Sequence, residues 1–283
     1  MDWLQALFLG LVQGLTEFLP VSSSGHLLIA RELLGVDAEG FLDFTVTVHM
    51  ATVLSTIVVF WKPILRLLSG FFKFKYNDET DYVLKILVSM IPVSLVGLLL
   101  KDKVEALFGD SLTTVAVFLA VTAALLFFSD MFGKPVVRPV PEPVDGSTSS
   151  PTGGPRNGIK FWQALLVGAG QALAVAPGLS RSGTTISVGL CAGVRRDVMA
   201  QFSFLMVLIP IIGEQALDVL KAVTGHAAMG GGISPVCLAV GFIAAFAAGL
   251  LACKAMVALV RRARLSWFAL YCLAVAVLIF IFA

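Results

Sequence analysis

Charged side chains are scarce in this sequence. Asp, Glu, Lys and Arg together make up 13% of its 283 residues, which is about half of what the surface of a soluble domain needs. Hydrophobic residues make up 58% of the chain, and the mean hydropathy is +0.94. This balance excludes a secreted enzyme, a nucleic-acid-binding protein and a disordered tail, and it predicts a helical protein that crosses a membrane several times.

Two local signals are also missing. No CxxC pair occurs, and the four cysteines lie in or beside apolar stretches, so we expect packing residues rather than disulfides or a metal site. The first 25 residues lack a basic region and contain Asp2 and Glu17, so no cleavable signal peptide is expected. The cysteines are Cys191, Cys237, Cys253 and Cys272.

Apolar runs of roughly 20 residues are the signal for membrane-spanning helices. Five are clear, and a sixth carries Glu214, Gln215 and Asp218. Two further stretches run through a Pro and a Ser/Gly-rich turn into a second, short apolar segment, which predicts re-entrant hairpins that return to the side they entered from. The expected spans are 41–61, 83–100, 112–132, 201–220, 235–260 and 266–283, and the expected hairpins are 2–34 and 161–194.

The two hairpins are related by an internal repeat. Shifting the chain by 158 residues aligns QALFLGLVQGL from Gln5 with QALLVGAGQAL from Gln163 and the SSSG turn with the SRSG turn, so that nine of 21 positions are identical. We therefore predict an all-α polytopic membrane protein of two repeats, 1–132 and 161–283, each a re-entrant hairpin followed by three transmembrane helices. Three crossings are an odd number, so the repeats are inverted, and inverted repeats place the functional site near the midplane.

Lys and Arg predict the orientation, because they gather in cytoplasmic loops. They cluster in the connections 62–85, 133–160 and 261–264. Placing these inside leaves both termini on the outer face. The 133–160 segment holds six of the twelve prolines together with Ser, Thr and Gly, which is typical of a flexible linker, here a cytoplasmic one.

The residues at the two turns are chemically specific. Charged residues inside membrane segments are costly and are therefore candidate functional residues. Gln13 and Glu17 are four residues apart, hence on one helix face, and together could offer two oxygens to a divalent cation completed by substrate phosphate. Each turn starts a short helix whose N–H groups and dipole suit an anion, and Arg181 adds a fork matched to phosphate. His26 can exchange a proton near neutral pH, and Ser23 or a water is a candidate nucleophile beside it.

We therefore predict a composite site. The catalytic residues are Glu17, Ser23, His26 and Arg181, and the metal ligands are Gln13 and Glu17. The substrate-binding residues are Ser22, Ser24, Gly25, Gln171, Ser180, Ser182, Gly183, Thr184 and Thr185.

Each of these residues also has a simpler interpretation. Serines at helix starts are usually caps. His26 could be merely hydrogen-bonded, and Glu17 could pair with Arg181 as a structural bridge. His49 and His226 keep this simpler interpretation and are expected to be merely hydrogen-bonded. The joint occurrence of carboxylate, imidazole, hydroxyl and guanidinium on matched turns favours the catalytic interpretation.

Two motifs carry a family resemblance. QGLTEFLPVSSSGH, from Gln13 to His26, and PGLSRSGTT, from Pro177 to Thr185, resemble the two signature motifs of the bacterial undecaprenyl-diphosphatase family, the bacitracin-resistance membrane phosphatases. The resemblance runs over nearly the whole chain. By motif position it assigns roles to Glu17, Ser23, His26, Ser180, Arg181 and Thr185.

The resemblance implies an enzyme of the bacterial plasma membrane that removes the terminal phosphate of undecaprenyl diphosphate. Such an enzyme recycles the lipid carrier for peptidoglycan synthesis and confers bacitracin resistance. It implies a divalent cation, Mg²⁺ or Ca²⁺, a site open to the outer, periplasmic face, and plausibly a homodimer. Gln13 stands where many relatives are acidic, so we expect weaker metal binding here.

Three alternatives stay open or are disfavoured. A secondary transporter or lipid flippase also uses inverted repeats with broken helices, and a structural membrane subunit would leave Glu17 and Arg181 unexplained. The type-2 phosphatidic acid phosphatase class needs a second His soon after the Arg, and none follows Arg181 before His226. Between Ser23 as nucleophile and a water activated by His26, the residues do not choose.

Overall fold

The computed structural model describes residues 1–37, 40–100, 111–132, 156–176, 178–223, 233–262 and 264–282. Most of the predicted linker 133–160 lies outside these residues, and so do Pro177, His226 and the side chains of Glu214, Gln215 and Asp218. Within the described ranges the chain is helical and has no strands. This confirms the prediction of an all-α polytopic membrane protein.

The helices follow one another along the chain without a sheet between them. They are α1 Trp3–Thr16, α2 Ser23–Leu33, α3 Phe41–Val59, α4 Trp61–Phe71, α5 Asp78–Leu99, α7 Leu112–Phe132, the short 3₁₀ turn η1 Arg156–Gly158, α8 Phe161–Leu173, α9 Arg181–Cys191, α10 Arg196–Val223, α11 Pro235–Arg262 and α12 Ser266–Phe282.

Five of these helices are long and apolar enough to cross a membrane: α3, α5, α7, α10 and α11. The remaining predicted span, 266–283, corresponds to α12, which has 17 residues. At 1.5 Å per residue it reaches roughly 25 Å, slightly less than the hydrocarbon core of about 30 Å. It is therefore the shortest of the predicted spans.

The predicted 62–85 loop is wrong in part. It contains all but the first residue of α4 and the first turns of α5, which begins at Asp78. Asn77 caps α5 by accepting a hydrogen bond from the backbone N–H of Thr80 at 2.7 Å, and acidic residues occupy the first turn, where the helix dipole favours negative charge. Acidic residues within this otherwise basic connection therefore begin a helix. Similarly, α10 begins at Arg196, five residues before the predicted span.

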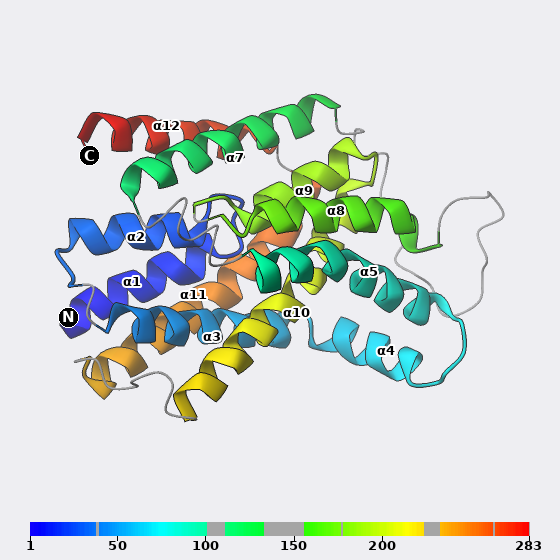
Figure 1. The fold of residues 1–283 in the computed structure, drawn as a ribbon, viewed down its shortest axis with the longest axis horizontal. Coiled ribbons are helices and arrows are strands. Elements are labelled where there is room, and N and C mark those ends of the chain that lie inside the picture. The colour runs from blue at the N-terminus through cyan, green and yellow to red at the C-terminus, as the bar shows by residue number, and fades with distance from the viewer. Residues whose placement is uncertain are drawn as a thin grey trace.

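The two hairpins α1–α2 and α8–α9 enter the bundle from opposite ends, and their turns meet near its middle (Figure 1). The helix α1 packs on α11, and α8 packs on α5. A shift of 158 residues relates α1 to α8 and α5 to α11, so these two pairings are equivalent in the repeat. Two related halves would give such pairings, and the inverted repeat itself stays a prediction.

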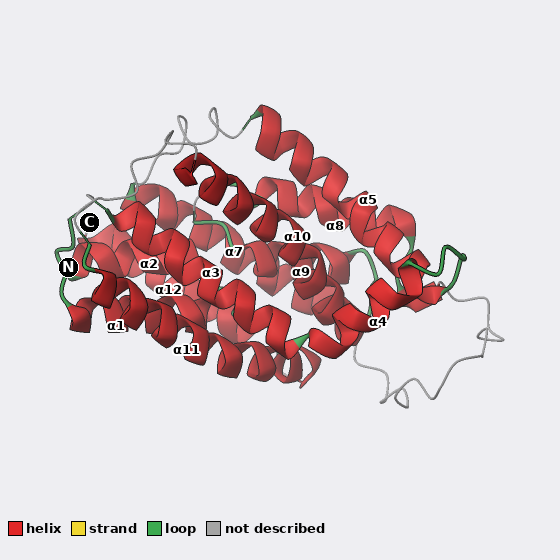
Figure 2. Cartoon of the chain, turned by 90° about the horizontal axis from the view of Figure 1, so that it is seen from below, coloured by secondary structure: helices red, strands yellow, loops and turns green. Residues whose placement is uncertain are grey.

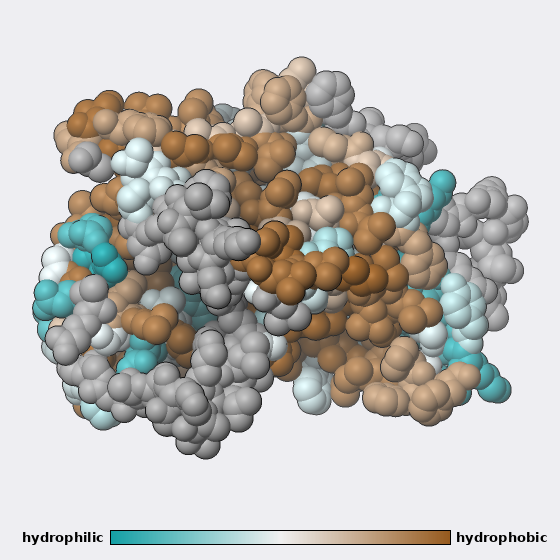
Figure 3. Space-filling model, viewed as in Figure 1, coloured by the Kyte–Doolittle hydropathy of each residue, from teal (hydrophilic) through white to brown (hydrophobic). Residues whose placement is uncertain are grey.

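Both views place the start of α1 and the end of α12 at the same end of the bundle, with α4 at the other end (Figures 1 and 2). Hydrophobic residues cover most of the face seen in Figure 3, and hydrophilic residues gather toward its two ends. Such a belt suits a lipid environment. The multi-pass arrangement is thus visible in both the helices and the surface.

Two pairs of oppositely charged residues lie in the spans away from the hairpin turns. Asp130 on α7 pairs with Arg196 of α10 at 2.5 Å and accepts two hydrogen bonds from Ser266 of α12, from its N–H at 2.7 Å and its hydroxyl at 2.6 Å. On α5, Lys85 pairs with Asp81, and both are buried. These pairs satisfy charges that would otherwise be costly in a membrane protein.

Small residues let the hairpin helices approach the spans closely. A Cβ on Gly14 would lie 2.5 Å from the carbonyl oxygen of Ala245 on α11. One on Gly168 would lie 2.1 Å from the carbonyl oxygen of Ser89 on α5. Real Cβ atoms do not come this near to a backbone, so each hairpin can sit against its span only with glycine there.

We predict that Gly168→Ala destabilises the protein by about 1–3 kcal/mol, the usual cost of overpacking. Gly97→Ala on α5 is the matched control, because nothing lies within 4 Å of its added Cβ, and alanine raises helix propensity by up to about 1 kcal/mol. Thermal unfolding in detergent measures both. Equal melting temperatures for the two variants would show that the α5–α8 contact is not as close as described.

Candidate active site

The two hairpin turns pack against each other. The hydroxyl of Ser182 at the start of α9 donates to the carbonyl oxygen of Leu19 in the first turn at 3.2 Å. A Cβ on Gly183 would lie 3.3 Å from the carbonyl oxygen of Pro20, and one on Gly25 would lie 3.7 Å from Cα of Gly178. The structure thus brings together the two turns that the repeat aligns.

Serines cap both short helices in the same way. Ser22 Oγ accepts a hydrogen bond from the N–H of Gly25 at 3.3 Å, and Ser180 Oγ accepts one from the N–H of Gly183 at 3.1 Å. Each cap hydroxyl also lies near the hydroxyl of the serine two positions later. The Oγ atoms of Ser22 and Ser24 are 3.5 Å apart, and those of Ser180 and Ser182 are 3.4 Å apart. The capping interpretation therefore holds for Ser22 and Ser180.

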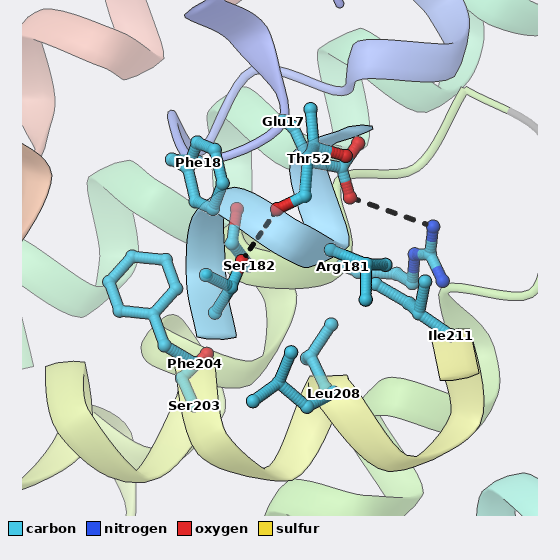
Figure 4. Close-up of a pocket in the computed structure, with 12 residues that line it drawn as sticks. Glu17, Phe18, Thr52, Arg181, Ser182, Ser203, Phe204, Leu208 and Ile211 are labelled. Carbon is cyan, nitrogen blue, oxygen red and sulfur yellow. Dashed lines mark hydrogen bonds and ion pairs between the residues drawn. The ribbon is translucent and has the colours of Figure 1, made fainter. Parts of the chain in front are cut away.

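Glu17 is the centre of the polar cluster. Its Oε2 accepts a hydrogen bond from the Ser23 hydroxyl at 2.5 Å and one from Nε2 of Gln13 at 2.8 Å. Its Oε1 lies 3.8 Å from Nη2 of Arg181, and the two side chains point toward each other in Figure 4. The Glu17 side chain is only 10% exposed. A carboxylate held in this way by a hydroxyl can take up the proton of that hydroxyl.

The sequence alone predicted no functional role for His49. This residue lies on α3, and its Nε2 is 3.8 Å from Oε2 of Glu17. Its Nδ1 is bonded to the carbonyl oxygen of Thr45 at 2.8 Å. The signal that could have found it is the rule already applied to Glu17: an ionisable residue inside a membrane span is a functional hypothesis. His49 lies outside both signature motifs, and from the sequence it is expected to be merely hydrogen-bonded.

The contacts of His26 are not those of a base that activates Ser23. Its Nδ1 is bonded to the carbonyl oxygen of Ser22 and its Nε2 to the hydroxyl of Tyr271 on α12, both at 2.8 Å. The two rings are stacked with centroids 5.5 Å apart. Among the described contacts, Ser23 Oγ bonds to Glu17 and none joins it to His26. The catalytic role of His26 stays a prediction, which these contacts do not favour.

A cavity of about 610 Å³ opens beside the cluster, within the size range of ligand sites. Its polar wall comes mainly from the two turns, with His49 of α3 and Gln171 of α8, and its apolar wall comes from α3, α5 and α10. The polar lining includes Glu17, Ser22, Ser23, Ser24, His49, Gln171, Ser180, Arg181 and Ser182, and the apolar lining includes Leu42, Val46, Met90, Val93, Ile209 and Ile211.

A second, small cavity of about 30 Å³ is also lined by Glu17, Arg181 and Ser182. Figure 4 shows these side chains with Phe18 and Phe204 around it. Because Glu17, Arg181 and Ser182 line both cavities, the polar cluster lies where the two cavities adjoin.

The remaining predicted binding residues divide into two kinds. The hydroxyl of Thr185 bonds to the carbonyl oxygens of Arg181 at 2.9 Å and Ser182 at 3.2 Å, and lies 2.6 Å from the hydroxyl of Ser203. Those contacts hold α9 together and join it to α10. Gln171 and Thr184 are buried, and their polar side-chain atoms have no partner. Gln171 also lines the large cavity, so its amide is free to meet a ligand.

The predicted metal pair fits a divalent cation. Oε1 of Gln13 is buried without a hydrogen-bond partner, and the neighbouring Glu17 supplies a carboxylate. An amide oxygen and a carboxylate are donors that hard cations take. Across the described residues, no group of three or more His, Cys, Asp or Glu side chains is placed to hold an ion, so such a cation would need an amide, substrate or water as further ligands.

These observations define a class of protein: a polytopic helical membrane protein with a buried carboxylate, hydroxyl and guanidinium where two hairpin turns meet. The comparison with known proteins gives the family. The family model "Bacitracin resistance protein BacA" matches residues 6–278, and the chain belongs to this family.

Curated relatives cover almost the whole chain. A protein of Bacteroides fragilis named "Undecaprenyl-diphosphatase" is 49% identical, over 98% of this chain and 97% of its own. One of Parabacteroides distasonis with the same name is 49% identical over 96% and 95%. Another of Methanosphaera stadtmanae, also so named, is 34% identical over 98% and 97%.

We predict different costs for removing two neighbouring hydroxyls. Thr185→Val should destabilise the protein by about 1–3 kcal/mol, because it leaves buried partners unpaired. Thr184→Val, which has the same shape change, should cost less or nothing, because the Thr184 hydroxyl is buried without a partner. Thermal unfolding in detergent compares the two. A larger loss for Thr184→Val would contradict the hydrogen bonding described for α9.

Proposed function

We propose that this chain is a membrane phosphatase that hydrolyses undecaprenyl diphosphate to undecaprenyl phosphate and inorganic phosphate. The observation that carries the proposal is the hydrogen bond from Ser23 to Glu17, opposite Arg181, in a cavity with one polar and one apolar wall. The family and the names of its relatives agree with this chemistry. In the bacterial inner membrane this reaction recycles the lipid carrier for peptidoglycan synthesis, and it accounts for bacitracin resistance.

The two walls of the cavity suit the two parts of such a substrate. The diphosphate would lie among the Ser/Gly turns, where Arg181 and the N–H groups that begin α2 and α9 neutralise its charge. The first isoprene units would lie along the apolar side chains of α3, α5 and α10, and the rest of the tail would continue into lipid. Phosphoryl transfer needs little besides positioning and charge neutralisation.

The contacts favour Ser23 as the nucleophile. Its Oγ attacks the terminal phosphorus while its proton passes to Oε2 of Glu17, and the bond from that phosphorus to the bridging oxygen breaks. Glu17 passes this proton to the departing oxygen, and undecaprenyl phosphate leaves. Glu17, again a carboxylate, then takes a proton from a water that attacks the phosphoserine, the bond from phosphorus to Oγ breaks, and Glu17 returns the proton to Ser23 as inorganic phosphate leaves. The alternative, a water activated by His26, is disfavoured because both ring nitrogens of His26 are already engaged.

Gln13 and Glu17 would hold a divalent cation, Mg²⁺ or Ca²⁺. When bound, such a cation neutralises charge on the phosphate oxygens. Gln13 contributes an amide oxygen in place of a second carboxylate, so we propose that this chain holds its cation more weakly than a relative with an acidic residue there.

We also propose that the termini and the mouth of the cavity face the periplasm. The basic helix α4, which carries Lys62 and Arg66, lies at the opposite end of the bundle from the termini (Figure 1), as the positive-inside rule favours. The cavity lining includes Leu42 in the first turn of α3, and α3 begins at the end of the bundle where the termini lie (Figure 1). A homodimer, which the family resemblance implies, belongs to the same proposal.

The activity is tested by phosphate release from a polyprenyl diphosphate in detergent. We expect release by the native protein and a loss on the order of 10²–10⁴ in rate for Ser23→Ala, Glu17→Ala and Arg181→Ala, because each removes transition-state stabilisation. Ser69→Ala on exposed α4 is the control and should be unaffected. Acid quenching should trap phosphate on Ser23.

Two results would contradict this scheme in different ways. Full turnover by Ser23→Ala would exclude the covalent route while leaving a phosphatase. No release by the native protein with any divalent cation would favour transport of a lipid instead.

The orientation is tested with a cysteine-free variant that carries one new cysteine. An impermeant maleimide added to intact cells, whose outer membrane is permeabilised if they have one, should label Leu33→Cys, which is 82% exposed at the end of α2. It should not label Lys75→Cys beside α4 until the cells are opened. The reverse pattern would place the cavity mouth on the cytoplasmic side.

A further inference from the structure

We propose that His49 is a third protein ligand of the cation at Gln13 and Glu17, and that it makes the site favour a cation that accepts nitrogen, such as Mn²⁺, over Ca²⁺. This inference rests on the proposed function only in taking the cation as a partner of the site. It adds a residue from α3 that neither signature motif contains.

The position of His49 relative to Glu17 suits a shared ion. Nε2 of His49 and Oε2 of Glu17 are 3.8 Å apart, too far for a direct hydrogen bond. Two ligands that each lie about 2.0–2.2 Å from one ion are separated by up to about 4 Å. Both side chains are largely buried, 13% and 10% exposed, and both line the large cavity, so an ion between them would be shielded from bulk water yet reachable by substrate.

The hydrogen bond at the other ring nitrogen identifies the tautomer. The carbonyl oxygen of Thr45 can only accept, so Nδ1 of His49 must carry the proton of that 2.8 Å bond. In the neutral ring, Nε2 then directs a lone pair toward the Glu17 carboxylate. Two acceptors that face each other repel unless a cation or a proton lies between them. A metal-bound His almost always donates its second N–H to a carbonyl or carboxylate in this way.

Gln13 supplies an independent observation that points to a ligand. Its Oε1 is fully buried and has no hydrogen-bond partner, and a buried acceptor without a partner costs free energy. A half-turn of the amide would bring Oε1 to the side of Glu17 where Nε2 now lies, which is also the side of His49. The three donors would then come from α1, from the turn that follows it and from α3.

His26 provides the contrast within the same protein. Its Nδ1 donates to the carbonyl oxygen of Ser22, and its Nε2 is bonded to Tyr271. No ring nitrogen of His26 is left for an ion. Of the two histidines near the first turn, only His49 has a nitrogen available to a cation.

The donor set predicts the metal preference. Carboxylate and amide oxygens suit Mg²⁺, Ca²⁺ and Mn²⁺, whereas imidazole suits transition metals. A site with two oxygen donors and one imidazole therefore favours Mn²⁺ among these three. Removing the imidazole should weaken Mn²⁺ binding and leave Ca²⁺ binding nearly unchanged.

The direct test is pulsed electron paramagnetic resonance on the full-length protein in detergent, loaded with Mn²⁺. We expect ¹⁴N modulation from a ligating imidazole in the native protein and in His26→Gln, and its loss in His49→Gln. Equilibrium binding should show that His49→Gln loses about tenfold or more in Mn²⁺ affinity and less than about twofold in Ca²⁺ affinity. Glu17→Ala should lose both cations.

Several results would overturn the proposal. They are the absence of Mn²⁺ binding or of ¹⁴N modulation in the native protein, and modulation that persists in His49→Gln. If His49 only forms an ion pair with Glu17, or only supports the fold, the native protein loaded with Mn²⁺ shows no ¹⁴N modulation. If His49→Gln unfolds, His49→Asn replaces it. Since the resonance signal needs no turnover, failure to release phosphate would reject the proposed function and leave the ligand assignment standing.

Discussion

The absence of water in the hydrocarbon core is the constraint on which the rest of this structure depends, because an open backbone there must find its partners within the protein. Both hairpins break their helices inside the bundle, and each break is closed by a serine cap and by the other turn. Ser22 and Ser180 accept hydrogen bonds from the N–H groups of the third residues of α2 and α9, and Ser182 donates to the carbonyl oxygen of Leu19 across the interface. The broken helices are therefore stable only as a pair.

The same constraint explains why reactive polar side chains lie together at the two hairpin turns. Elsewhere in the described spans, four buried or half-buried charges form two pairs, Asp130 with Arg196 and Lys85 with Asp81. At the turns, Glu17 faces Ser23, Gln13, His49 and Arg181 with a cavity beside it. A group held by donors but still open to a chamber can exchange protons or bind a ligand, whereas a fully paired group cannot. The low charge of the chain thus makes the few charges at the site informative.

The cavity links this cluster to a lipid substrate. Its apolar wall comes from spans that need hydrophobic side chains in any case, and its polar wall comes from turns that need serine and glycine to close. No separate binding domain is required. Membrane-spanning helices and capped turns together make a site with one face for a diphosphate and one for a hydrocarbon chain.

Local sequence pattern determined the membrane class, the two hairpins and the nearness of Glu17 to Ser23, because helix faces, caps and turns depend on residues a few positions apart. The internal repeat, rather than local spacing, predicted that Arg181 would join them. The same local pattern did not predict the helix α4, which lies almost entirely in the predicted loop 62–85. It also did not predict the start of α10, which precedes the predicted span 201–220 by five residues. Only the tertiary structure decided that His49 lies beside Glu17 and that His26 is held by Tyr271, 245 residues away. Those contacts join helices far apart in the chain, and side-chain packing between helices sets them, which no local spacing encodes.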